Sequence, residues 1–213
     1  ALSKGEALKG LVLDLRGNGG GLLNEGVEVA GHFLNRGQVV VRHRSRNAPE
    51  RPYQARRGGQ AKDYPIVVVV DRSSASAAEI VAGALQDHDR GWILGENTFG
   101  KGLVQTVYPL AEETGLALTT AHYYTPSGRL IQRDYSSISF VEYVTHKNLE
   151  KKNLNDVKMT DSGRTVYGGG GISPDDKVDP GKLNKFQIEV AFRRNAFMYF
   201  ATKFFAGRNH DYK

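Results

Sequence analysis

The sequence contains no cysteine, so it can form neither a disulfide nor a thiolate metal site. This absence does not indicate a compartment, because cysteine-free chains occur in oxidising and reducing surroundings alike. No apolar run reaches the roughly 18 residues that a membrane-spanning helix needs. The first residues, Ala1 to Glu6, also lack the apolar stretch of a signal peptide. We therefore expect contact with a membrane only through segments that this chain does not contain.

Neither sign of charge dominates the chain, which has 29 basic and 23 acidic residues among 213. The basic residues are spread over several stretches and do not form one tract interleaved with aromatic residues. We therefore expect no nucleic acid as a partner. The six histidines show no metal-ligand spacing with carboxylates, so we expect no metal and no other cofactor. The apolar fraction of 39% is enough for a sizeable core.

A strand, a glycine loop and a helix follow one another near the start of the chain. Leu11 to Leu15 predicts an interior strand, Arg16 to Gly21 forms the loop, and Leu22 to Leu34 has apolar residues at helical spacing. The pattern recurs where the strand predicted at Tyr64 to Val70 leads into a turn and an alanine-rich helix after Ser76. Alternation of this kind predicts an α/β fold with a mostly parallel sheet flanked by helices.

The remaining segments give shorter or less regular elements. They are a strand at 38–42, an exposed loop or β-ribbon at 43–63, a short strand at 92–94, a hairpin of strands at 103–110 and 116–124, an amphipathic helix near 140–149 and a long helix at 183–205. The last helix has a wide apolar face, which needs a partner surface.

Two polar residues form a pairing typical of nucleophilic catalysis. Ser76 begins the alanine-rich helix, where unpaired backbone N–H groups favour a developing negative charge. Lys101 lies in the glycine-flanked sequence that begins at Thr98, and a lysine can act as the base that a serine hydroxyl requires. We expect Phe99 to keep the amine dry and so to favour its neutral form, and Gln105 to orient it without adding a charge. Each residue also has a purely structural explanation, a helix cap for the serine and a solvated loop for the lysine.

The first glycine loop is a candidate for stabilising an oxyanion. Backbone N–H groups from Gly17 to Gly21, together with the amide of Ala77, could point at a developing negative charge. The same glycines also fit a tight strand-to-helix turn, and both interpretations can hold together.

Two rival sites are weaker. Gly95 to Lys101 matches the start of a phosphate-binding loop, but Gly102 replaces the required Ser or Thr, and a strand follows where a helix is needed. We therefore expect no nucleotide site. His88 is the one rival base, but it shares the helix of Ser76 and lies about 18 Å away along the helix axis.

Five ordered segments over roughly residues 9–180 closely resemble motifs of the C-terminal processing peptidases, also called tail-specific proteases. They are Leu13-Asp14-Leu15-Arg16-Gly17-Asn18-Gly19-Gly20-Gly21, the stretch from Ser74 to Asp87, Gly95 to Gln105 with its Thr98-Phe99-Gly100-Lys101-Gly102 centre, and the later pair Tyr124 to Arg129 and Gly168 to Asp175.

The resemblance implies a serine endopeptidase that cleaves proteins near their C-termini, through an acyl-enzyme and without a cofactor. It implies Ser76 as nucleophile, Lys101 as general base and Gln105 as the residue that orients the lysine. The backbone amides of Gly20 and Ala77 would form the oxyanion hole. The implied fold is an α/β core of the crotonase-like (ClpP/crotonase) type, and the implied partners are protein or peptide substrates bound in extended form.

The chain departs from the family in one respect, because members usually carry a PDZ domain and further core strands ahead of the Leu-Asp-Leu-Arg motif. We therefore expect a peptidase core at 1–180 that lacks these parts, and a helical extension at 181–213 that packs on the core or on a neighbouring subunit. Such a fragment could be inactive alone or could form a homo-oligomer. By analogy with the family, we expect a periplasmic or cell-envelope location.

Two other functions stay open on the sequence. One is a catalytically silent peptide-binding module of the same fold, although Ser76, Lys101 and Gln105 are all retained. The other is a crotonase-type acyl-CoA enzyme, which shares the glycine-loop chemistry but gives no role to Lys101.

Overall fold

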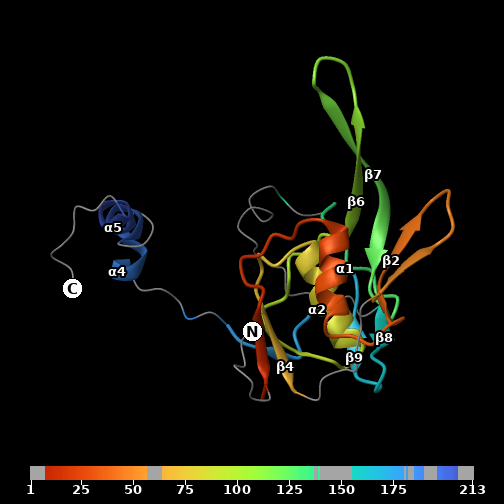
Figure 1. Ribbon diagram of the computed structural model, residues 1–213, viewed down its shortest axis with the longest axis horizontal. Coiled ribbons are helices and arrows are strands. Elements are labelled where there is room, and N and C mark those ends of the chain that lie inside the picture. Colours follow the sequence, from red (N-terminus) through yellow and green to blue (C-terminus); the bar gives the residue numbers. More distant parts are fainter. Residues whose placement is uncertain are drawn as a thin grey trace. The chain divides into compact units, whose positions relative to one another are not determined.

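The computed structural model describes residues 8–56, 64–136, 139, 155–179, 181, 185–189 and 196–205. The chain divides into two compact units, Ala1–Val178 and Asp179–Lys213. Among its described residues, the first unit contains two four-stranded sheets, two helices and a small two-stranded ribbon (Figure 1).

The first sheet is entirely parallel. Its strands, in spatial order, are β1 (Leu11–Asp14), β4 (Ile66–Val70), β5 (Trp92–Gly95) and β10 (Asp176–Lys177). Along β4 every second residue is fully buried, starting at Ile66, and the residues between are half-buried. This burial on both faces is typical of a central parallel strand and explains the continuous valine run. The predicted strand-loop-helix units are confirmed.

Two helices pack against each other beside this sheet (Figure 1). They are α1 (Leu23–Gly31) and α2 (Ala77–Asp87), and every residue of α2 is buried. The helices approach closely because small residues meet: a Cβ added at Gly26 would lie 3.2 Å from the Cβ of Ala77. The start of α2 is thereby fixed against α1.

The second sheet is antiparallel, so the prediction of one mostly parallel sheet holds for the first sheet alone. Its strands, in spatial order, are β3 (Arg51–Gln54), β2 (Val39–Ser45), β7 (Gly115–Tyr124) and β6 (Leu103–Pro109). The β6–β7 hairpin projects away from the helices (Figure 1). The two edge strands, β3 and β6, contain Pro52 and Pro109, which have no backbone N–H to donate.

A buried ion pair joins the end of α2 to the segment after β7. Arg129 donates hydrogen bonds to Asp87 and to Gln86 Oε1, and the Arg129 and Asp87 side chains are each 1% exposed. Next to this segment lies the small ribbon of β8 (Val157–Met159) and β9 (Thr165–Tyr167). The guanidinium of Arg129 donates to the carbonyl of Tyr167 and so connects this ribbon to α2.

The second unit contains α4 (Lys185–Ile188) and α5 (Ala196–Phe205). These two segments fall within the long helix predicted at 183–205, but residues 190–195 lie outside the described residues, as does the helix predicted near 140–149. Phe186, Met198 and Tyr199 are largely exposed. Among the helices of the described residues, none is both long and apolar enough to cross a membrane.

Candidate active site

Ser76 occupies a strained turn between β4 and α2. Its backbone has φ 56° and ψ −117°, a conformation that side-chain-bearing residues rarely adopt. The carbonyl of Ser76 accepts the N–H of Ile80, so the helix begins directly after the strained residue. A strained strand-to-helix turn is also how α/β hydrolases present a nucleophilic serine.

The first glycine loop lies directly against this turn. Gly20 has φ 96°, and a Cβ added there would lie 2.7 Å from Ser76 Cβ and 2.9 Å from the Ala77 nitrogen. Asn18 ties the loop to the turn, because its carbonyl accepts the N–H of Ala75 at 2.9 Å. A glycine at position 20 is therefore required by both its backbone conformation and the close approach of the two segments.

The two predicted oxyanion donors differ in their present bonding. The N–H of Ala77 has no acceptor among the described residues, as is typical of the first residue of a helix. The N–H of Gly20, by contrast, donates to Asn18 Oδ1 at 2.9 Å. The structure thus places both amides near Ser76, but only Ala77 is free to bind an oxyanion in this arrangement.

Lys101 lies on a turn that meets the Ser76 turn. The backbone N–H groups of Ser76 and Lys101 donate to the same oxygen, Glu79 Oε2, at 2.9 and 2.8 Å. The two predicted residues are therefore neighbours along their backbones. Their side chains make no hydrogen bond with each other, and Lys101 is exposed.

The dry surroundings expected for the lysine amine are absent from this arrangement. Phe99 packs against Tyr135, with ring centroids 5.6 Å apart, while Lys101 remains exposed. That expectation is wrong for the structure as it stands, because the Phe99 ring has a partner of its own.

Gln105 lies in β6, directly after a register shift between Val104 and itself. A bulge of this kind changes the direction of the side chains that follow it. The Gln105 side chain is exposed and makes no hydrogen bond with Lys101. Its predicted role in orienting the amine therefore stays a prediction.

The positions of His88 and of the partial phosphate-loop match agree with the sequence analysis. His88 follows the last residue of α2, at the opposite end from Ser76, and its ring bonds to Asp161 Oδ2 and to the carbonyl of Val39. Leu103 begins strand β6 directly after the G-x-x-x-x-G-K match, where a phosphate loop would begin a helix.

Glu79 is a site residue that the sequence interpretation missed. Its side chain is fully buried, and it accepts hydrogen bonds from the N–H groups of Ser76, Gly100 and Lys101 and from Thr98 Oγ1. Burial raises the pKa of Glu79, while these four donors act in the opposite direction. A glutamate three positions after a helix-capping serine is the signature of a capping box, which could have identified it.

Arg133 is the second residue that was missed. It is buried, and its guanidinium donates to the carbonyls of Thr98 and Phe99, both at 3.1 Å, and to that of Gly170. The turn that carries Lys101 is thus held through its N–H groups by Glu79 and through its carbonyls by Arg133.

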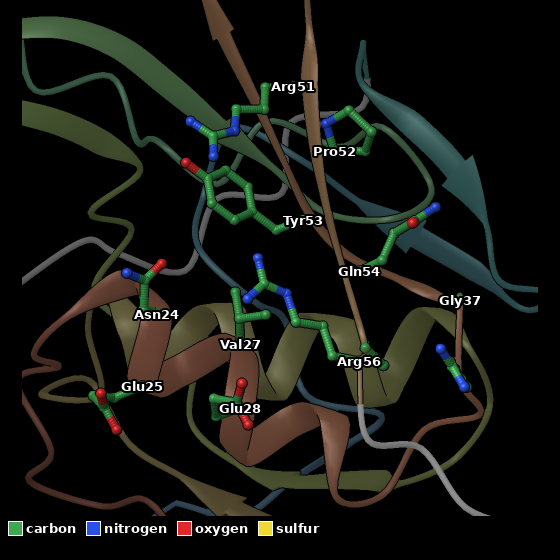
Figure 2. A pocket seen from close by; sticks show the side chains of 12 residues that line it. Asn24, Glu25, Val27, Glu28, Gly37, Arg51, Pro52, Tyr53, Gln54 and Arg56 are labelled. Carbon is green, nitrogen blue, oxygen red and sulfur yellow. The ribbon is translucent and has the colours of Figure 1, made fainter.

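A polar pocket of about 760 Å³ lies between α1 and β3 (Figure 2). Figure 2 shows Glu25 and Glu28 on the helix side and Arg51 and Tyr53 on the strand side. Neither Ser76 nor Lys101 lines this pocket, so it is separate from the predicted catalytic pair.

The sequence matches the family model described as Peptidase family S41 over residues 1–137. The chain belongs to this family. The S41 chain is 53% identical over 128 residues to the carboxy-terminal-processing protease of Bartonella bacilliformis, covering 60% of this chain and 29% of that protein. It is 48% identical over 127 residues to the chloroplastic C-terminal processing peptidase of Tetradesmus obliquus, covering 60% of this chain and 27% of that protein.

A solved structure supports the same assignment for this S41 chain. The photosystem II D1 C-terminal processing protease has a TM-score of 0.60 and 37% identity, and the match covers 83% of this chain and 36% of that one. The matches thus cover under a third of the Bartonella bacilliformis and Tetradesmus obliquus proteins and 36% of the protein in the solved structure. The resemblance to C-terminal processing peptidases and the α/β fold with a parallel sheet are confirmed.

Proposed function

We propose that the protein is a serine endopeptidase that cleaves proteins near their C-termini, with Ser76 as nucleophile and Lys101 as general base. The observation that carries the proposal is the shared hydrogen bonding of the two turns: the N–H groups of Ser76 and Lys101 meet at one carboxylate oxygen. Residues far apart in sequence are held side by side, on a strained turn and a glycine-flanked turn.

The proposed reaction uses Ser76, Lys101, two backbone amides and water. The neutral amine of Lys101 takes the proton of Ser76 Oγ, and the oxygen attacks the peptide carbonyl. The oxyanion accepts the N–H of Ala77 and, once Asn18 releases it, the N–H of Gly20. The lysine ammonium then protonates the leaving amine, and water hydrolyses the acyl-enzyme with Lys101 again as base.

In this proposal, the hydrogen bond between Lys101 and Ser76 forms when substrate binds. Lys101 is exposed and does not bond to Ser76, as is common when catalytic hydrogen bonds tighten only in the substrate complex. An extended peptide over the Ser76 turn would exclude water from the amine. In our proposal, Gln105 orients the amine at that stage.

The properties of the whole protein are part of the proposal. We assign the peptidase core to residues 1–180 and a helical extension to 181–213, with protein or peptide substrates bound in extended form. The family analogy favours a periplasmic or cell-envelope location and allows a homo-oligomer. The chloroplastic relative from Tetradesmus obliquus shows that the family also occurs in an organelle.

The test is turnover of a quenched-fluorescent peptide by the protein and its variants. Ser76→Ala and Lys101→Ala should each lower kcat by about 10⁴-fold or more, because each removes a member of a unit that acts together. Ser73→Ala and Lys177→Ala are matched controls at exposed positions and should retain full activity.

Labelling with a fluorophosphonate distinguishes an enzyme from a silent binding module. We expect one covalent adduct at Ser76 in the unmodified protein and none in Ser76→Ala. A protein that binds the peptide but shows neither turnover nor an adduct would instead be the binding module.

A further inference from the structure

We infer that Glu79 is the positioning residue of this site: its carboxylate sets the distance between the nucleophile turn and the base turn by accepting backbone N–H groups from both. This inference rests on the proposed function, since it concerns how Ser76 and Lys101 are brought together.

The bonding pattern divides the carboxylate between the two turns. Oε2 accepts the N–H of Ser76 at 2.9 Å and the N–H of Lys101 at 2.8 Å, so the two nitrogens are separated by no more than the sum of these distances. Oε1 accepts Thr98 Oγ1 at 2.5 Å and the N–H of Gly100 at 2.7 Å. Each oxygen has two donors, which satisfies the acceptor capacity of an ionised carboxylate.

The same bonds determine which amide faces the substrate. The N–H of Ser76 points inward to Glu79, while the next N–H along the chain, that of Ala77, has no acceptor among the described residues. Fixing the Ser76 amide thus leaves Ala77 as the free donor at the start of α2. The Glu79 carboxylate therefore acts on the oxyanion hole as well as on the dyad, although it bonds only to backbone N–H groups and to Thr98 Oγ1.

The Lys101 turn has further supports that do not involve Glu79. The N–H of Phe99 donates to the carbonyl of Ser74 at 3.0 Å, and Arg133 donates to the carbonyls of Thr98 and Phe99. These contacts should keep the turn folded when the carboxylate is changed, although no longer at the position that Glu79 sets. We therefore expect a Glu79 variant to fold with a distorted site.

Glu79→Gln is the direct test because it keeps size and shape. An amide has one acceptor oxygen and one NH₂ donor, so in either orientation the NH₂ faces at least one backbone N–H. We expect kcat to fall about 100-fold, the usual cost of a misplacement of about 1 Å, with KM for the peptide nearly unchanged. Glu96→Gln is the matched control: Glu96 binds Arg72, bonds to neither turn, and its variant should retain kcat.

A second pair of variants covers the case in which Glu79→Gln fails to fold. Thr98→Val removes the hydroxyl that donates to Glu79 Oε1 and accepts the N–H of Ile172, whereas Thr98→Ser keeps both bonds. We expect Thr98→Val to lower kcat about tenfold, the equivalent of one hydrogen bond to a charged group, and Thr98→Ser to restore most of it. If Thr98 had a purely structural role, the melting temperature would fall in Thr98→Val and in Thr98→Ser, and the two variants would not differ in kcat.

The outcomes separate this inference from the proposed function. A folded Glu79→Gln variant with unchanged kcat, or equal kcat in Thr98→Val and Thr98→Ser, would overturn the positioning role and leave the dyad intact. If Ser76→Ala cleaves as fast as the unmodified protein, the proposed function itself fails. A lower kcat with unchanged KM in Glu79→Gln, together with wild-type kcat in Glu96→Gln, supports the inference.

Discussion

Helix α2 and the β6–β7 hairpin are both rich in apolar residues, but their surroundings differ completely. Every residue of α2 is buried between α1 and the strands, whereas most of the hairpin is exposed, including Val107, Leu116 and Leu118. Ser76, the proposed nucleophile, lies at the start of the buried element, and Lys101, the proposed base, lies just before the exposed one. The contrast indicates that tight packing fixes Ser76, while the lysine side chain lies at the edge of the packed region.

The largest stability effect should come from the buried ion pair behind α2. Replacing Arg129 with Met leaves Asp87 as an uncompensated buried charge, which typically costs about 3–5 kcal/mol. Urea unfolding should show this loss. Arg16→Met is the matched control, because its pair with Asp14 is exposed, and no measurable change is expected there. Similar losses in both variants would contradict the contrast in burial.

A core leucine of α2 should have the next largest effect. Leu85 is 0% exposed, and Leu85→Ala should lower the free energy of unfolding by about 2–5 kcal/mol through lost burial and a cavity. The measurement is again urea unfolding, in which the dependence of the free energy of unfolding on urea concentration should stay constant. A loss below about 1 kcal/mol would mean that α2 is less tightly packed than its burial indicates.

A histidine in β2, the strand that pairs with β7, should make stability depend on pH. Burial lowers the pKa of His43 below 6.5, and the nearby Arg51 cation lowers it further. The ring Nε2 is buried and has no hydrogen-bond partner in the part of the chain that the structure describes. The unfolded chain therefore takes up a proton more readily, so stability is full above pH 6.5 and is lost as the pH falls below it. The melting temperature should drop less between pH 7.5 and 5.5 in His43→Phe.

The control for this pH effect is His32→Phe, at an exposed position. In this variant the melting temperature should fall between pH 7.5 and 5.5 by as much as it does in the unmodified protein. If the melting temperature of His43→Phe falls with pH as steeply as that of the unmodified protein, another group causes the pH dependence.

The smallest effect should come from the hairpin. Leu118 is 46% exposed, so Leu118→Ala should change the free energy of unfolding by no more than about 0.5 kcal/mol. The same substitution of leucine by alanine should therefore lower the free energy of unfolding strongly at position 85 and hardly at all at position 118. A loss at Leu118 as large as that at Leu85 would indicate that the hairpin is covered in solution.

The local pattern of the sequence was enough to predict the parallel sheet and its helices. A buried valine run, a glycine loop and apolar residues at helical spacing each occur within a few residues, so β4 and α1 are correctly placed. The antiparallel sheet was only partly predictable. The hairpin has a local turn, but the pairing of Arg42 in β2 with Tyr124 in β7 joins distant segments without any local signature.

The candidate site shows the same limit. Ser76 and Lys101 were recognisable because their residue types and glycine neighbours indicate chemistry. Glu79 was overlooked because it lies within an alanine-rich helix, where a single acid is usually a surface residue. Its importance depends on the Lys101 turn folding over the helix, a contact of high sequence separation that no spacing rule contains.

The prolines of the two edge strands have a consequence for handling the protein in concentrated solution. An exposed apolar ribbon is prone to stack edge to edge with a second molecule and to grow into fibres. Pro52 in β3 and Pro109 in β6 have no backbone N–H, so each removes one donor from the hydrogen bonds that a strand of a second molecule could form. The antiparallel sheet can therefore keep an apolar hairpin in water without becoming a template for polymerisation.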